Sequence, residues 1–273
     1  MAETVAAVAG SIAAWTRRLL PDETRAGRLA AALAAEFGAA TTAIDEAGCR
    51  RIERVCHRFS RHLTLEFDSA GRLVPDEGSP TGWPPPDAAA ILNRGAGVRS
   101  AERDGDVGTL RIDSLEPWRY ARRFVTEAAE HLAGCRELVL DLRHNGGGEM
   151  DTMAAVAGLV LGQGGVPLVR VTTRTSAEQW HTPEPGPAVS WAGRATVLTG
   201  AGTYSSGECL AYVLQQRGVP VAGEATAGAA DHCTPVHVSP HVTALIPYGM
   251  VVDLLNGGNW EGTGVVPDIA GLC

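Results

Sequence analysis

The sequence predicts an α/β fold in which a mixed-sheet core follows a small helical region at the N-terminus. The chain has 273 residues, enough to bury most of its apolar surface. Hydrophobic residues make up 45% and charged residues 20%, with 33 glycines, as in globular proteins rich in turns. Helical spacing dominates residues 1–60, residues 61–106 read as a strand and a Pro-rich connector, and residues 107–273 read as the α/β core.

The N-terminal region predicts at least two helices. Leu29, Leu33 and Phe37 recur at helical spacing, and Pro21 interrupts the pattern just before Asp22, which can cap a second helix. Residues 62–68 alternate apolar and polar side chains, which predicts a strand that enters a turn. Residues 78–86 contain four prolines and predict a loop or linker.

The core alternates between strand-like and helix-like segments. The expected strands are 107–112, 137–143, 166–173 and 195–198, and the expected helices are 122–132, 150–161 and 207–216. Short β-like stretches follow at 219–223, 236–238, 243–247 and 250–254. This alternation indicates a mixed sheet covered by helices.

Composition excludes several function classes. The net charge is −8 and the basic residues form no run, so we expect no nucleic-acid partner. No apolar run reaches the roughly 18 residues that span a bilayer, so we expect no membrane role. The first apolar stretch precedes Arg17 and Arg18, the wrong order for a signal peptide. We expect a cytoplasmic protein whose cysteines are free thiols, namely Cys49, Cys56, Cys135, Cys209, Cys233 and Cys273.

Ser205 is the candidate nucleophile. Residues 196–199 predict a strand that ends in a Gly-rich turn, and Ser205 then opens the helix. A serine at such a turn is exposed, and the amides of the first helical turn point toward whatever it attacks. The same spacing, with Glu208 three residues later, also fits an ordinary capping box.

A glycine-rich loop is the candidate oxyanion hole. Residues 141–148 read Asp-Leu-Arg-His-Asn-Gly-Gly-Gly and follow an expected buried strand. Three glycines permit a tight turn that presents free backbone amides. A plain turn or a phosphate-binding loop is the alternative, although the segment lacks the Lys-Ser/Thr of a nucleotide-binding loop.

Four ordered motifs together resemble the C-terminal processing (tail-specific) serine peptidase family. They are residues 140–148, Thr-Tyr-Ser-Ser-Gly-Glu at 203–208, Gly-Glu-Ala-Thr-Ala-Gly at 223–228, and Glu-Gly-Thr-Gly-Val-Val-Pro-Asp at 261–268. The resemblance implies a core of the ClpP/crotonase-like type, a peptide or protein substrate, and Ser205 rather than Ser206 as the nucleophile. It also implies an oxyanion hole formed by the amide of Ser206 and an amide of Gly147 or Gly148.

The sequence departs from that family in two places. Ala229 stands where the Ser/Lys members carry their lysine, and the chain contains no lysine, so a Ser/Lys dyad is excluded. Residues 63–106 are too short and too Pro-rich for the family's PDZ module. Both departures resemble the branch of the tricorn protease core and the modules of interphotoreceptor retinoid-binding protein.

That branch implies a histidine base and a glutamate, which match His62 and Glu261. Imidazole is the side chain already poised to accept a proton near pH 7, and a carboxylate behind it fixes its tautomer. His232 is the alternative base. His57, His144 and, for the acid, Glu224 also remain open.

No cofactor or metal is expected. His237 and His241 have helical ligand spacing, but Pro240 lies between them in a β-like stretch. A serine peptidase is therefore the expected function. The alternatives are a non-catalytic binding module for an apolar ligand or peptide, and an acyl-transferring or cyclising enzyme. The sequence does not predict an oligomeric state.

Overall fold

The computed structural model describes residues 3–184 and 194–271, so Cys273 lies outside the described residues. The chain divides into two compact units. Unit 1 comprises Met1–Pro85, Val171–Ala177 and Asp231–Val251, and unit 2 comprises Pro86–Arg170, Glu178–Ala230 and Val252–Cys273. The expected core, residues 107–273, thus contributes segments to both units.

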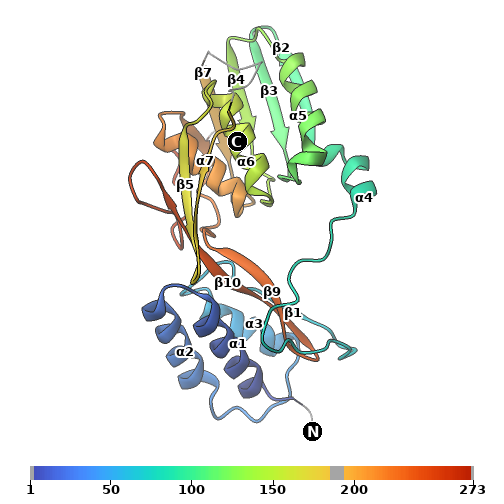
Figure 1. Cartoon of the computed structure of the whole chain (residues 1–273), viewed down its shortest axis with the longest axis vertical. Coiled ribbons are helices and arrows are strands. Elements are labelled where there is room, and N and C mark those ends of the chain that lie inside the picture. The colour runs from blue at the N-terminus through green and yellow to red at the C-terminus, as the bar shows by residue number, and fades with distance from the viewer. Residues whose placement is uncertain (1–2, 185–193, 272–273) are drawn as a thin grey trace. The chain divides into compact units, whose positions relative to one another are not determined.

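Unit 1 begins with three helices (Figure 1). A polar side chain caps the start of each. They are α1 (Val5–Leu19), α2 (Glu23–Phe37) and α3 (Glu46–Cys56), with Thr4, Asp22 and Asp45 as the N-caps. Asp22 accepts a hydrogen bond from the Arg25 amide at 2.8 Å, as its position after Pro21 predicted.

A long hairpin completes unit 1. It consists of β9 (His232–Ser239) and β10 (Val242–Asp253), and the short strand β1 (Leu65–Phe67) pairs antiparallel with β10. Alternate residues of the hairpin face the helices and join their core, namely Val236, Val238, Val242, Ala244 and Ile246. On its other side β10 neighbours β5 (Pro167–Thr172), which pairs with β6 (Ala177–His181).

Unit 2 contains a six-stranded mixed sheet in the order β11-β8-β7-β4-β3-β2. The strands are β2 (Val98–Asp104), β3 (Val107–Ile112), β4 (Glu137–Asp141), β7 (Arg194–Thr199), β8 (Val221–Gly223) and β11 (Ile269–Ala270). β2 pairs antiparallel with β3, and every other neighbouring pair is parallel. The mixed α/β fold predicted from the sequence is confirmed.

The helices of unit 2 are α4 (Ala88–Asn93), α5 (Trp118–His131), α6 (Met150–Leu161) and α7 (Ser206–Gln216), with a 3₁₀ turn η1 at Gly95–Gly97. The predicted helix 150–161 and strand 107–112 match α6 and β3. α5 begins four residues earlier than predicted. None of the helices in the described ranges is long and apolar enough to span a membrane.

Candidate active site

Four parallel strands of unit 2 end at the same edge of the sheet. β3, β4, β7 and β8 lie side by side in parallel, so the loops that leave their carboxyl ends meet there. These loops are residues 113–117, 142–149, 200–205 and 224–230. The topology therefore gathers the glycine loop, Ser205 and the Gly-Glu-Ala-Thr-Ala-Gly motif at one place.

Ser205 has a strained backbone between β7 and α7. Its φ is 53° and its ψ is −123°. Among the described residues other than glycine, only Ser205 and Ala96 have a positive φ. Such a conformation costs about 1–3 kcal/mol and persists only where the surrounding structure enforces it. A strand-to-helix turn of this kind presents a serine hydroxyl outward, as at the nucleophile of α/β-hydrolases.

Glu208 is a major part of the enforcing structure. Its fully buried carboxylate accepts hydrogen bonds from the Ser205 amide at 2.9 Å, the Gly228 amide at 2.6 Å and the Ala229 amide at 2.9 Å. The hydroxyl of Thr226 donates a fourth bond at 2.5 Å. Burial raises the pKa of the Glu208 carboxyl, and the four donors offset part of that rise. The predicted capping pair is thus present, and it ties the serine turn to the loop after β8.

Asn145 holds the glycine loop against the serine turn. Its side-chain nitrogen, Nδ2, donates to the carbonyl of Ile112 at 2.9 Å, and its side-chain oxygen, Oδ1, accepts from the Gly147 amide at 2.9 Å. Its backbone carbonyl accepts from the Tyr204 amide at 2.9 Å. Asn145 is completely buried. One side chain therefore links the end of β3 to the loop after β4, and its backbone links that loop to the residue before Ser205.

The peptide between Gly147 and Gly148 has a fixed orientation. Its carbonyl accepts from the Leu115 amide at 2.7 Å. Because the C=O and N–H groups of a trans peptide point in opposite directions, the Gly148 N–H points away from Leu115. The Gly147 N–H is already bonded to Asn145. Of the two glycine amides predicted as candidate donors, that of Gly147 is therefore engaged within the loop.

Ser206 contacts the same loop. Its hydroxyl donates to the carbonyl of Gly148 at 2.7 Å. A methyl group at Gly147 would lie 2.7 Å from the Cβ of Ser205 and 3.2 Å from the Ser206 nitrogen. Ser205, Ser206, Gly147 and Gly148 are therefore brought together.

Glu261 is anchored to the loop that Glu208 organises. Its carboxylate accepts from the Ala230 amide at 2.8 Å, one residue after the amide that Glu208 binds. The neighbouring Trp260 is buried, and its indole N–H donates to the carbonyl of Ala229 at 3.3 Å. The predicted alternative acid, Glu224, is exposed at the end of β8.

The two candidate bases lie in unit 1. His62 is in the turn between α3 and β1 and is buried, and His232 is the first residue of β9. Burial lowers the pKa of His62 to about 3, with a further contribution from His232, and burial lowers the pKa of His232 to about 4. Both imidazoles are therefore neutral at pH 7. His57 caps the end of α3, 3.6 Å from Glu53.

A cluster of Arg25, Asp231 and Ser60 includes residues that lie next to both candidate bases in the sequence. The guanidinium of Arg25 contacts both carboxylate oxygens of Asp231 at 3.0 Å. Ser60 donates to the same carboxylate at 3.1 Å. Since Asp231 precedes His232 and Ser60 lies two residues before His62, this cluster fixes the two segments that carry the imidazoles.

Three further histidines have other surroundings. His144 is exposed in the glycine loop. His237 and His241 contact the backbone carbonyls of Val74 and Asp68, at 3.3 and 2.9 Å. The described part of the chain contains no group of three or more residues placed to hold a metal ion.

Sequence reasoning missed the positioning roles of Asn145 and Leu115. Asn145 is part of the quoted glycine motif, and its place before three glycines was the available signal. Leu115 had no such signal, because its contribution is a backbone bridge to Gly148, far along the chain, that no local spacing reveals.

Known proteins resemble this chain in sequence and in structure. The sequence model of peptidase family S41 matches residues 106–270, more than half of the chain. The chain is similar to the structure of a photosystem II D1 C-terminal processing protease, with a TM-score of 0.56, 16% identity, and coverage of 98% of this chain and 93% of that one. A lipoprotein from Streptococcus agalactiae is similar with a TM-score of 0.59, 14% identity, and coverage of 100% and 93%. At these identities the structural likeness establishes the fold.

Proposed function

Since the chain belongs to peptidase family S41, we propose that it is a serine peptidase that cleaves peptide or protein substrates through Ser205. The observation that carries this proposal is the strained backbone of Ser205, with φ 53°, packed directly against Gly147. A mere helix cap needs no positive φ, because caps ordinarily adopt extended backbone angles. The strain is consistent with a hydroxyl held out toward a substrate.

The chemistry we propose is acyl transfer in two stages. The Ser205 oxygen attacks the scissile carbonyl carbon while its proton passes to an imidazole, and the carbonyl electron pair moves onto oxygen. The amides of Ser206 and Gly148 are the proposed donors to that oxyanion. The intermediate collapses as the C–N bond breaks and the imidazolium protonates the leaving amine. Water then attacks the acyl-enzyme with the same base, which releases the second product.

His62 is the proposed base and Glu261 the proposed carboxylate behind it. A neutral imidazole can accept a proton, but one whose pKa is held at about 3 is a weak base. A carboxylate that stabilises the imidazolium as it forms removes part of this deficit. This is the role that we assign to Glu261.

A fluorophosphonate probe with intact-mass readout tests the nucleophile. We expect stoichiometric labelling of the wild-type protein and none of the Ser205→Ala variant. Ser100→Ala, which changes a serine on the edge strand β2, is the matched control and should label normally. Absence of labelling in a well-folded wild-type protein would favour a binding role instead.

The base is identified by two separate replacements. His62→Ala should slow labelling by about 100-fold or more, as expected when a general base is lost, whereas His232→Ala should change it much less. The reverse pattern would make His232 the base. His57→Ala serves as a control because His57 belongs to the same turn region.

A further inference from the structure

The last turn of α7 holds the segment that carries Glu261. Gln215 donates to the carbonyl of Val266 at 2.8 Å and to Asp268 at 3.1 Å. Gln216 accepts from the side chain of Asn256 at 2.7 Å. Arg217, the C-cap, contacts Asp253. Three consecutive residues thus hold both ends of the segment 253–268.

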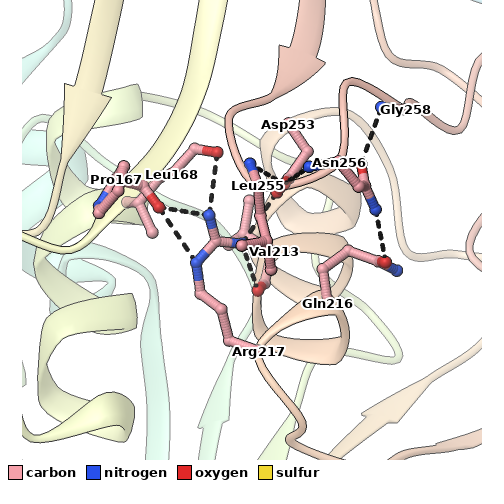
Figure 2. A network of polar contacts seen from close by, with 9 residues as sticks. All are labelled: Pro167, Leu168, Val213, Gln216, Arg217, Asp253, Leu255, Asn256 and Gly258. Atoms are coloured by element: carbon pink, nitrogen blue, oxygen red, sulfur yellow. Dashed lines mark hydrogen bonds and ion pairs between the residues drawn. The ribbon is translucent and has the colours of Figure 1, made fainter.

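Arg217 is the centre of this arrangement (Figure 2). Its guanidinium donates to the Asp253 carboxylate at 2.8 Å, and both side chains are buried. It also donates to the carbonyls of Val213 at 2.8 Å, Pro167 at 3.1 Å and Leu168 at 3.2 Å. Arginine suits this position because its planar fork serves several acceptors at once, which a lysine ammonium cannot reproduce.

Asp253 in turn shapes the loop that follows β10. Its second carboxylate oxygen accepts from the amides of Leu255 at 2.7 Å and Asn256 at 3.3 Å. Its backbone amide donates to the carbonyl of Gly258 at 2.8 Å, and its carbonyl accepts from the Gly257 amide at 2.9 Å. The turn is therefore fixed by a residue whose charge is balanced by Arg217.

The path from this turn to Glu261 is short and packed. The ring centroid of Tyr212, on α7, lies 5.0 Å from that of Trp260. Trp260 is 1% exposed and bonds to Ala229, and Glu261 follows it and accepts from Ala230. Ser205 stands at the start of α7 and Arg217 at its end, so a single helix of 11 residues connects the nucleophile to the Glu261 segment.

We propose that Arg217 is a positioning residue that sets Glu261 relative to Ser205 through Asp253 and the 253–260 loop. The proposal rests on the role assigned to Glu261 above. Arg217 touches no reacting atom. It acts by fixing a loop whose misplacement by about 1 Å can cost on the order of 100-fold in rate.

Hydrogen exchange tests the physical part of the proposal without reference to activity. In Arg217→Lys, amides of residues 253–262 should exchange at least 10-fold faster than in wild type, while those of β3 and β4 stay unchanged. Val125→Ala is the matched control, because it truncates a buried side chain of α5 and lowers stability without touching this loop. Unchanged exchange in 253–262 would overturn the proposal.

A double-mutant cycle tests the connection to Glu261. Arg217→Lys should slow fluorophosphonate labelling of Ser205 by about 10- to 100-fold in the wild-type background. In the Glu261→Gln background the same change should have little further effect, because both substitutions remove the same contribution, that of a correctly placed Glu261 carboxylate. Fully additive effects would show that Arg217 acts in another way and would overturn the proposal.

Two other failures can be told apart from failure of this proposal: misfolding of the Arg217→Lys variant, and failure of the proposed peptidase function. Should Arg217→Lys not fold, Arg217→Met combined with Asp253→Asn removes the pair without leaving a buried charge, and the same two measurements apply. If the wild-type protein does not label at all, the serine peptidase assignment of Ser205 fails. The exchange measurement then decides by itself whether Arg217 fixes the loop.

Discussion

Gly147 has no side chain because Ser205 leaves no space for one. The backbone at Gly147 has a φ of 96°, and a Cβ there would lie 2.7 Å from the Cβ of Ser205. Real Cβ atoms do not approach so closely, so an added methyl group must push the glycine loop and the serine turn apart. The close approach therefore requires a residue without a side chain at this position.

Gly147→Ala should therefore lower both stability and labelling. We expect a loss of about 2–4 kcal/mol in the free energy of unfolding, from backbone strain and overpacking together. Fluorophosphonate labelling should fall more than this loss of folded protein explains. Gly146→Ala is the matched control, because nothing lies within 4 Å of an added Cβ there. It should change stability by less than about 0.5 kcal/mol, and equal effects at the two positions would contradict our account.

The residues of the site were predictable to different degrees. The placement of Ser205 and the glycine loop at turns follows from local spacing, since a strand, a turn and a helix start are all encoded within a dozen residues. Their roles, and that of Ser206, were implied only by the resemblance of four ordered motifs to a peptidase family. Which of the Gly147 and Gly148 amides is bonded within the loop was not predictable. It depends on the Asn145 side chain taking the Gly147 amide, and on Leu115 orienting the next peptide.

At the scale of elements, the Asp231 carboxylate joins three parts of unit 1 through its ion pair with Arg25 and its hydrogen bond from Ser60. Arg25 belongs to α2, Asp231 precedes β9, and Ser60 follows α3. The Asp231 side chain is 1% exposed, so its charge depends on Arg25 for compensation. Removing one partner of a buried pair leaves the other as an uncompensated buried charge.

Arg25→Met should destabilise the protein by about 3–5 kcal/mol, measured by urea unfolding at pH 7. Arg50→Met is the matched control. Arg50 also lies on a helix of unit 1 and pairs with a carboxylate, that of Glu46 on the same helix. Both side chains are more than half exposed. Its replacement should cost less than about 0.5 kcal/mol. A small effect at Arg25 would mean that water reaches Asp231 and replaces the guanidinium.

Edge strands were among the elements that sequence reasoning missed, as was α4, which lies in the predicted connector. β2 and β6 have mostly exposed side chains, so neither shows the apolar alternation that identifies a half-buried strand. The hairpin was predicted only as three short stretches, at 236–238, 243–247 and 250–254. The structure accommodates Pro247 beside a register shift between Pro247 and Gly249, so β10 continues through it.

At the scale of the whole molecule, the two units do not follow the order of the chain. Residues 171–177 and 231–251 group with the N-terminal helices. Val236, Val238 and Val242 explain this for the hairpin, because they complete the core of α1, α2 and α3. Composition alone could not indicate it. An apolar strand face predicts that it is buried, but not which partner buries it.

Burial of His62 makes the stability of the whole protein depend on pH. The pKa of His62 is lowered to about 3 in the folded protein, whereas an unfolded histidine titrates near 6.5. Below pH 6.5 the unfolded state therefore binds more protons than the folded state, so stability falls as the pH falls. His232, with a pKa lowered to about 4, adds in the same direction.

His62→Gln should reduce this dependence, because glutamine takes up no proton in either state. Between pH 6 and pH 4.5 one such histidine contributes a slope approaching 1.4 kcal/mol per pH unit to the free energy of unfolding. We expect urea unfolding at pH 7, 6, 5 and 4.5 to show a shallower slope for the variant by about that amount. The slope counts protons, so it is informative even if the variant is less stable at every pH. An identical slope in both proteins would mean that water or a moving segment reaches His62, and that its imidazole titrates in the folded protein as it does in the unfolded chain.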